Sequence, residues 1–148
     1  MIGPISITEK PIQADDLLAQ VSADEFGAVI LFLGTVRNEH QGRKVISIDY
    51  DVHPELARQA LSDIAGEIEQ SHPVGRVVIT HRVGHVKTGE IAIGIAVSGA
   101  HRDEAYRASR QAIEEIKRRV PIWKKENYED GESAWLKGTV LDRGAAES

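Results

Sequence analysis

Lysine side chains that could do acid–base chemistry gather where a predicted helix gives way to a loop. Lys117 lies in the last turn of an amphipathic run, and Lys124 and Lys125 come shortly after it. Because Pro121 has no N–H and disfavours helical angles in the residue before it, the helix should end at Val120. Neighbouring ammonium groups repel one another and burial disfavours their charge, so both effects lower the pKa of a lysine toward useful acid–base chemistry.

The helix that positions Lys117 is predicted by spacing. Its apolar residues recur three and four positions apart, as on one helix face: Ala105, Ala108, Ala112, Ile113, Ile116 and Val120. Asp103 and Glu104 lie in its first turn and basic residues in its last, which suits the helix dipole. A basic helix end is more often a solvated face than a site, so spacing alone leaves both interpretations open.

Anion-binding candidates lie at two other points of the chain. His101 and Arg102 follow an apolar strand and open the helix, where N–H groups and the dipole favour anions. The alternative is an ordinary polar helix start. Arg37 ends the most apolar strand and, taken alone, is a strand-end arginine that faces solvent.

Other patterns predict structure rather than chemistry. His81 and His85 are four positions apart, but Gly84 lies between them in a strand-to-turn region, so this is not a helical zinc motif. Each is better interpreted as a structural histidine. Trp123 and Trp135 are predicted to be core and interface anchors. Phosphate loops and a serine nucleophile elbow are missing from the sequence.

Composition narrows the class of protein. The 148 residues contain no cysteine, which excludes disulfides, thiolate zinc sites and a cysteine nucleophile, so any sulfur must come from a partner or substrate. The net charge of −5 argues against a nucleotide- or RNA-binding protein, and aromatic stacking platforms are lacking. Basic residues are nevertheless dense from Arg102 to Lys125, which suits a small anionic ligand or an acidic partner tail. Because the sequence shows neither a signal-peptide pattern nor an apolar run long enough to span a membrane, we expect a cytoplasmic protein.

The sequence predicts that residues 1–148 form one domain of the α+β class, in which residues 143–148 are a frayed tail. Strands are predicted at 2–8, 27–36, 45–52, 77–82 and 91–98, and helices at 14–21, 54–70 and up to Val120, followed by short extended segments around the tryptophans. The strand at 45–52 should return beside 27–36, and residues 38–44 should be a mobile exposed loop. The second helix should bury Leu56, Ala57, Ala60, Leu61, Ile64 and Ile68.

Several of these segments together resemble the large, catalytic subunit of molybdopterin synthase. They are Phe32-Leu33-Gly34-Thr35-Val36-Arg37-Asn38, His81-Arg82-Val83-Gly84 with Gly89-Glu90, Ala100-His101-Arg102, Lys117, and Pro121-Ile122-Trp123-Lys124-Lys125-Glu126. The last is the most specific, and the similarity runs in order from about residue 27 to residue 135. Two departures stand out. His53 occupies the place of a family tyrosine, and the spacing from Gly131 to Trp135 is one residue longer.

The resemblance implies an α/β hammerhead fold, with a mostly antiparallel sheet, helices packed on it and a smaller accessory sheet. It implies a sulfurtransferase that converts cyclic pyranopterin monophosphate into the dithiolene of molybdopterin. The sulfur would arrive as a thiocarboxylate on the C-terminal Gly-Gly of a small ubiquitin-fold subunit, so no cofactor or metal is expected. A homodimer with one small subunit at each end, a heterotetramer, is also implied.

The same resemblance assigns roles to single residues. Lys117 and Lys124 would be catalytic, by polarising the thiocarboxylate and moving protons. Arg37, His101 and Arg102 would bind the phosphate or pterin, and Lys125 would bind the partner's carboxylate. The alternative is a non-catalytic module that binds a ubiquitin-like tail or a pterin without turnover.

Overall fold

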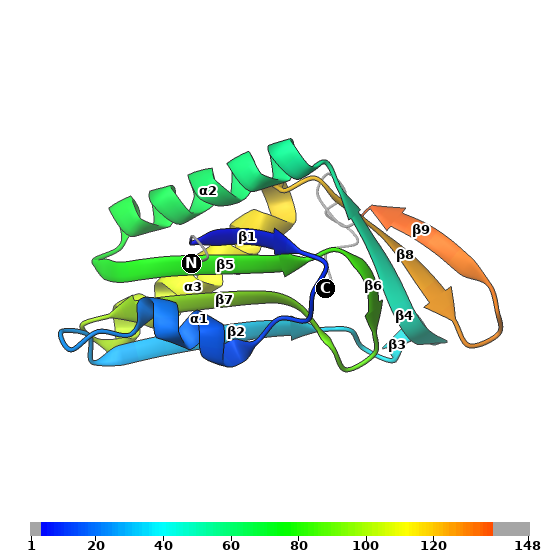
Figure 1. Cartoon of the computed structure of the whole chain (residues 1–148), viewed down its shortest axis with the longest axis horizontal. Helices are drawn as coiled ribbons and strands as arrows, with labels where there is room; N and C mark the ends of the chain where they lie inside the picture. Colours follow the sequence, from blue (N-terminus) through cyan, green and yellow to red (C-terminus); the bar gives the residue numbers. More distant parts are fainter. Residues whose placement is uncertain (1–3, 138–148) are drawn as a thin grey trace.

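The computed structural model describes residues 4–137, which form helices and two β-sheets (Figure 1). The strands are β1 (Ile5–Thr8), β2 (Ala28–Thr35), β3 (Glu39–His40), β4 (Arg43–Val52), β5 (Val74–Arg82), β6 (Gly84–Lys87), β7 (Ile91–Gly99), β8 (Ile122–Tyr128) and β9 (Ser133–Lys137); the helices are α1 (Ala14–Val21), α2 (Pro54–Ser71) and α3 (Arg102–Arg119). The predicted α+β class is confirmed. The predicted tail at 143–148 lies outside the described residues. Within them, no helix has the length and apolar character that a membrane crossing requires.

Four strands form the main sheet, in the order β1-β5-β7-β2. β5 pairs antiparallel with β7, and so does β2, whereas β1 lies parallel to β5. The sheet is therefore mostly antiparallel, as predicted. The central strand β7 is almost continuously apolar, and β5 is apolar at its centre from Val77 to Ile79, because helices cover both faces of the sheet.

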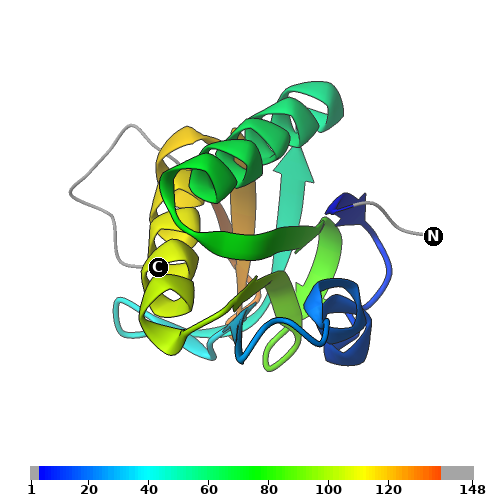
Figure 2. The ribbon, with the colours of Figure 1, turned by 90° about the vertical axis from the view of Figure 1, so that its left-hand side faces the viewer.

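Alternate side chains of the central strands enter two different cores. Val77 and Ile79 pack with α2 and α3, whereas Val78 between them packs with Leu17 of α1. Figure 2 shows the same layers, with the main sheet between α1 and the pair α2 and α3. The pair is also joined at its surface, where Arg119 of α3 donates to both carboxylate oxygens of Glu67 at 2.6 and 2.9 Å.

α2 begins as the sequence predicts, but its first turn is more exposed. Pro54 occupies a first-turn position, where its missing N–H has no helical partner to lose. His53 caps the helix, since its Nδ1 accepts a hydrogen bond from the Leu56 N–H at 3.3 Å. The predicted burial of Leu56 is wrong, because its side chain is 58% exposed. At 100° per residue it lies about 120° around the helix from the centre of the buried face.

The second sheet crosses one end of the main sheet (Figure 1). The resemblance implied that this accessory sheet is the smaller one, but it has five strands and the main sheet has four. Its strand order is β3-β4-β8-β9, and β6 pairs with β4. The prediction that β4 lies beside β2 is wrong, because β2 pairs with β7 and β4 pairs with β6 and β8. Where β4 approaches the main sheet, a small core forms from Val36, Val45, Ile48, Val86, Ala92 and Tyr128.

Residues 39–44 form a tight hairpin, so the predicted mobile loop is wrong. Glu39 pairs with Lys44 and His40 with Arg43. The two turn residues between them, Gln41 and Gly42, both have positive φ, 52° and 82°. This is the backbone geometry of the two-residue turns that match strand twist, and Gly42 adopts it without steric cost. Gln-Gly is a weaker turn signal than Asn-Gly, which is why the sequence alone indicated a loop.

Candidate active site

A pocket of about 490 Å³ lies between the second sheet, the end of the main sheet and the last turns of α3. Its lining comes from every one of these parts: Phe32, Gly34, Thr35, Val36, Arg37, Glu39, His40, Ile48, Tyr50, His81, Ala92, Ile93, Ile113, Glu114, Ile116, Lys117, Ile122, Lys124 and Glu126. The walls are largely apolar, and a few charged groups converge on them. This combination is typical of small-molecule sites.

Lys117 and Lys124, the two predicted catalytic residues, both line the pocket. They reach it from different elements, because α3 ends after Arg119 and β8 starts at Ile122. The turn between them is made by Pro121, as the sequence predicts, and it brings the strand back along the end of the helix. The two ammonium groups therefore face one space from two rigid supports.

Arg37 also lines the pocket, and backbone hydrogen bonds fix its position. The preceding residue, Val36, donates to the carbonyl of Glu90 at 3.1 Å and accepts from the N–H of Gly89 at 2.8 Å. Arg37 thus leaves the end of β2 held against the turn between β6 and β7. A guanidinium in such a position can bind a phosphate through two parallel hydrogen bonds.

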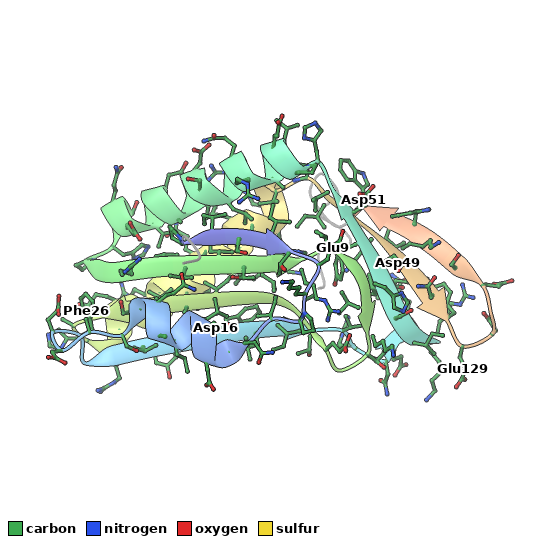
Figure 3. All side chains as sticks on the ribbon, in the orientation of Figure 1. Glu9, Asp16, Phe26, Asp49, Asp51 and Glu129 are labelled. Carbon is green, nitrogen blue, oxygen red and sulfur yellow. The ribbon has the colours of Figure 1, made fainter. Side chains whose placement is uncertain are left out.

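The second sheet has an inner face toward the pocket and an outer face away from it. Strand alternation and the pairing of β4 with β8 define them. The inner face carries Ile48, Tyr50, Lys124, Glu126 and Tyr128; the outer face carries Asp49, Asp51, Trp123, Lys125 and Asn127. Figure 3 labels two of the outer residues, Asp49 and Asp51, on β4.

Lys125, a predicted substrate-binding residue, lies on the outer face and does not line the pocket. Its Nζ is 5.8 Å from the centre of the Trp135 ring, a cation–π distance. Trp123 and Trp135 are 40% and 58% exposed, so the prediction that they anchor the core is wrong. Both belong to strand positions that point away from the pocket.

His101 and Arg102, the other predicted substrate-binding residues, lie at the opposite end of α3 from Lys117. Both are exposed, and neither lines the pocket. Fifteen helical positions separate Arg102 from Lys117, which corresponds to about 22 Å along the axis. Within one chain, these residues and the lysines cannot hold the same small molecule.

The sequence-based reasoning missed the acid–base groups on the inner face. Glu126 is a buried carboxylate whose Oε1 lies 2.9 Å from His40 Nδ1 and accepts the hydroxyl of Tyr128 at 3.0 Å. Burial, helped by this hydrogen bond and the charge of Glu126, raises the pKa of Tyr128, so its hydroxyl stays a donor. The sequence contained one signal for Glu126: it lies two residues after Lys124 in a predicted extended segment, and residues two apart in a strand lie on the same face.

His81, interpreted above as structural, also lines the pocket. Its ring packs edge-on against Tyr50 with the centroids 5.4 Å apart, and its Nδ1 lies 2.7 Å from the Arg82 carbonyl, to which it donates. Burial lowers the pKa of His81 to about 4, and the charge of Lys117 acts in the same direction. Burial, with the charge of Glu126, raises the pKa of Tyr50 to about 12. Both side chains are therefore neutral near pH 7.

The arrangement suits an anionic ligand. Arg37, Lys117 and Lys124 surround apolar walls, and such cations stabilise negative charge more strongly there than in water. Among residues 4–137, no three His, Cys, Asp or Glu side chains are grouped so that they could hold a metal ion. The chemistry that these residues themselves offer is electrostatic stabilisation and proton transfer.

Comparison with known proteins agrees with this geometry. A family model described as "MoaE protein" matches residues 7–119. The chain belongs to the MoaE protein family. It is 44% identical over 127 residues to the molybdopterin synthase catalytic subunit of Halalkalibacterium halodurans, covering 86% of this chain and 81% of that protein. It is 43% identical to the protein of the same name from Bacillus subtilis, over 88% of this chain and 82% of that protein.

Solved structures of MoaE-type proteins have the same fold. The molybdopterin synthase structure from Staphylococcus aureus matches with a TM-score of 0.86 and 39% identity, over 92% of this chain and 98% of that chain. A complex of subunits 1 and 2 of molybdopterin-converting factor from Helicobacter pylori matches with a TM-score of 0.77 over 97% and 98% of the chains; at 21% identity this shows the fold alone. The predicted family is confirmed, and relatives named molybdopterin synthase catalytic subunit indicate an enzyme of molybdenum cofactor biosynthesis, as predicted.

Proposed function

We propose that this MoaE-family chain transfers sulfur from the C-terminal thiocarboxylate of a small partner subunit to a phosphorylated pterin, and so forms a dithiolene. One observation carries the proposal: Lys117, Lys124 and Arg37 converge on one pocket from α3, β8 and the end of β2. Pterin phosphate and partner tail are both anionic, so both would be drawn to these three cations.

Lys117 and Lys124 would act on the reacting atoms. An ammonium group beside the thiocarboxylate carbonyl stabilises the negative charge that develops on oxygen when the acyl carbon is attacked. Either amine can also donate or accept a proton as the substrate ring opens. Arg37 would hold the phosphate, which fixes the pterin against the apolar wall of the pocket.

The donor would be a small ubiquitin-fold subunit with a C-terminal Gly-Gly. The relatives at 43–44% identity are named as the catalytic subunit of an enzyme, which supports the existence of a second, partner subunit. Glycines lack side chains, so an extended tail can enter a narrow pocket while the folded part of the partner stays outside. Since no cysteine is available in this chain, the partner would also supply the sulfur, without a metal or further cofactor.

A homodimer of this chain, each copy with one small subunit, completes the proposed assembly. It bears directly on His101 and Arg102, because they lie about 22 Å along α3 from Lys117 of their own chain. If they bind the pterin as the resemblance implies, a second copy must bring them to the pocket. Their roles, and that of Lys125 toward the partner, remain predictions.

The test is a reconstitution. Purified chain, thiocarboxylated partner and the cyclic pyranopterin are mixed, and dithiolene formation is followed by its oxidised fluorescent derivative. We expect turnover that depends on the thiocarboxylate, with a partner carrying an ordinary carboxylate as the control. Tight binding of both ligands without any product would instead identify a non-catalytic binding module.

A further inference from the structure

His81 has one ring nitrogen to which nothing in the described part of the chain donates. Its Nδ1 lies 2.7 Å from the Arg82 carbonyl, and a carbonyl oxygen can only accept, so Nδ1 carries the ring proton. Nε2 of the neutral ring then has a lone pair and can only accept. The residue is 5% exposed, yet Nε2 is not among the fully enclosed unpaired atoms of residues 4–137, which are Arg82 Nε and Glu104 Oε1. It therefore still reaches open space, and the space that His81 lines is the pocket.

The main sheet and the second sheet together fix the direction of this ring. Val77, Ile79 and His81 alternate along β5 and share the face that α2 and α3 cover. His81 is the last of the three and lies where this core gives way to the pocket. The bond to the Arg82 carbonyl holds the ring on one side, and Tyr50 packs edge-on against it with the centroids 5.4 Å apart. Nε2 is therefore a preorganised acceptor.

The surroundings keep this acceptor uncharged. Burial lowers the pKa of His81 to about 4, and the charge of Lys117 acts in the same direction. Protonation would turn Nε2 into a donor, so the lowered pKa preserves an acceptor at neutral pH. A carboxylate in the same place would also accept a hydrogen bond, but it would repel an anionic ligand. A neutral imidazole accepts without adding negative charge to the pocket.

A row of residues across the main sheet joins this nitrogen to the cationic end of the pocket. Strand register places His81 beside Ile93 of β7, and Ile93 beside Gly34 of β2. The row spans two strand spacings, roughly 9.5 Å, and Arg37 follows shortly after Gly34. All four residues line the pocket. Gly34 has no side chain, and a Cβ there would lie 2.8 Å from Ile93 Cγ2, so the row forms a low apolar floor between His81 and Arg37.

A phosphorylated pterin has groups that match the two ends of this floor. Its phosphate is at one end of the fused rings, and its pyrimidine ring at the other end carries an amide N–H and an amino group, both of which donate. With the phosphate on Arg37, this N–H edge extends along the floor toward His81. We propose that His81 Nε2 accepts a hydrogen bond from the N–H edge of the pterin and so selects a 2-amino-4-oxo pyrimidine ring. The inference rests on the proposed function and adds the residue that recognises the ring rather than the phosphate.

The peptide N–H groups of the partner's tail are a second source of the same donor chemistry. The tail would enter from solvent and end at Lys117 and Lys124, so its peptide groups trail back toward the pocket mouth. His81 is almost inaccessible from outside and lies at the end of an apolar floor that suits a flat ring. These features favour the pterin, and separate titrations with the pterin and with the partner distinguish the two sources.

Three variants isolate the role of Nε2. His81→Asn is the test variant, because its amide can still donate to the Arg82 carbonyl but has no atom at the position of Nε2. His81→Gln carries an amide oxygen toward that position and should restore part of the lost affinity. His85→Asn is the matched control on the outer face, where the His85 side chain is 56% exposed and does not line the pocket.

The first measurement is titration calorimetry without the partner, so that no turnover intervenes. His81→Asn should bind the cyclic pyranopterin roughly five- to fiftyfold more weakly than wild type, because the ligand N–H loses its acceptor. His85→Asn should bind it as wild type does, and His81→Gln should lie between wild type and His81→Asn. Melting temperatures and circular dichroism confirm that each variant is folded.

The second measurement removes the donor from the ligand instead of the acceptor from the protein. The stable probes are 6-hydroxymethylpterin phosphate and its 2-deamino and 3-methyl derivatives, each of which lacks one N–H donor. At least one derivative should bind wild type roughly five- to fiftyfold more weakly than the parent probe. His81→Asn should lose that preference, since the two changes remove the same hydrogen bond. The preference of wild type among the probes tests the inference even if His81→Asn does not fold.

Each outcome decides between defined alternatives. Equal pterin affinity in folded His81→Asn and wild type, or no preference of wild type among the probes, overturns the inference. Weaker binding of the partner by His81→Asn with unchanged pterin affinity assigns a tail N–H to Nε2 and overturns it too. A wild type that binds the pterin with the expected preference but forms no dithiolene contradicts the proposed function alone. A wild type that binds no pterin contradicts both.

Discussion

The inner and outer faces of the second sheet carry similar side chains in different surroundings. Lys124 and Lys125 are neighbours in sequence, yet strand alternation directs one into the pocket and the other over the Trp135 ring. Each face also has a histidine within hydrogen-bond distance of a carboxylate, His40 with Glu126 inside and His85 with Asp49 outside.

What differs is the burial and the surrounding charge. On the outer face, Asp49 shares its hydrogen bonds between Asn127 and His85, and these lower its pKa in a setting open to water. On the inner face, Glu126 lies under apolar walls with cations nearby, where electrostatic interactions are stronger. Residue type and contact distance are therefore poor guides to function. The position of the pair relative to the pocket is the better one.

The largest expected difference between the faces is that between the lysines. Lys124→Ala, and Lys117→Ala beside it, should each lower product formation by ~10²–10⁴, because a group acting on the reacting atoms is lost. Lys125→Ala should weaken partner binding by about fivefold or less, as expected for an exposed charge. Steady-state rates at saturating pterin, with melting temperatures as the folding control, decide between them. Near-normal turnover in Lys124→Ala would contradict the claim that the inner-face lysine is catalytic and the outer-face lysine is not.

Burial at the pocket can be measured through His81, whose ring meets Tyr50 of the inner face. Because its pKa is lowered from 6.5 to about 4, the neutral folded state is fully favoured above pH 6.5. On acidification from 6.5 toward 4 the unfolded chain binds a proton that the folded chain does not, so the free energy of unfolding should fall by about 3 kcal/mol.

Urea unfolding between pH 7 and 4 tests this prediction. His81→Asn, which keeps a donor for the Arg82 carbonyl, should remove most of that pH dependence while costing some stability throughout. An identical slope in the variant and wild type would mean that another group is responsible.

Substitution of Arg37 tests whether the pocket binds the phosphate of the substrate. Arg37→Ala should weaken the phosphorylated pterin by roughly 1.5–3 kcal/mol, or about ten- to a hundredfold, with little effect on the partner. Titration calorimetry with the pterin alone measures it. His101→Ala and Arg102→Ala belong in the same series, since a comparable loss there requires a second copy at the pocket. Unchanged affinity in all three variants would locate the phosphate elsewhere.

The smallest effects concern the hairpin that turns His40 inward. Gly42 has a φ of +82° and open space around it, so Gly42→Ala should cost about 1 kcal/mol through backbone strain alone. Gly66 in α2 also has open space but helical angles, so Gly66→Ala should stabilise by about 0.5–1 kcal/mol. The same Gly→Ala change should therefore lower the free energy of unfolding at position 42 and raise it at position 66, which chemical denaturation can measure. Equal signs would mean that conformation at residue 42 does not hold the hairpin.

The sequence alone determined the features that depend on neighbours within a few positions. The spacing of apolar residues predicts α1, α2 and α3 with boundaries close to those observed, and Pro121 predicts the end of α3. Such signals are local, because residues three and four apart share a helix face whatever the rest of the chain does. The motif containing Lys124 likewise identified the family before any fold was known.

Only the tertiary structure decided which of these groups meet. Lys124 faces the pocket and Lys125 does not because β8 pairs with β4, more than seventy positions earlier, and that pairing sets the faces. His40 joins Glu126 through a hairpin with weak turn residues, and His101 is separated from Lys117 by the length of α3. Strand pairing over such distances results from competition among all possible partners for burial, so no local pattern can specify it.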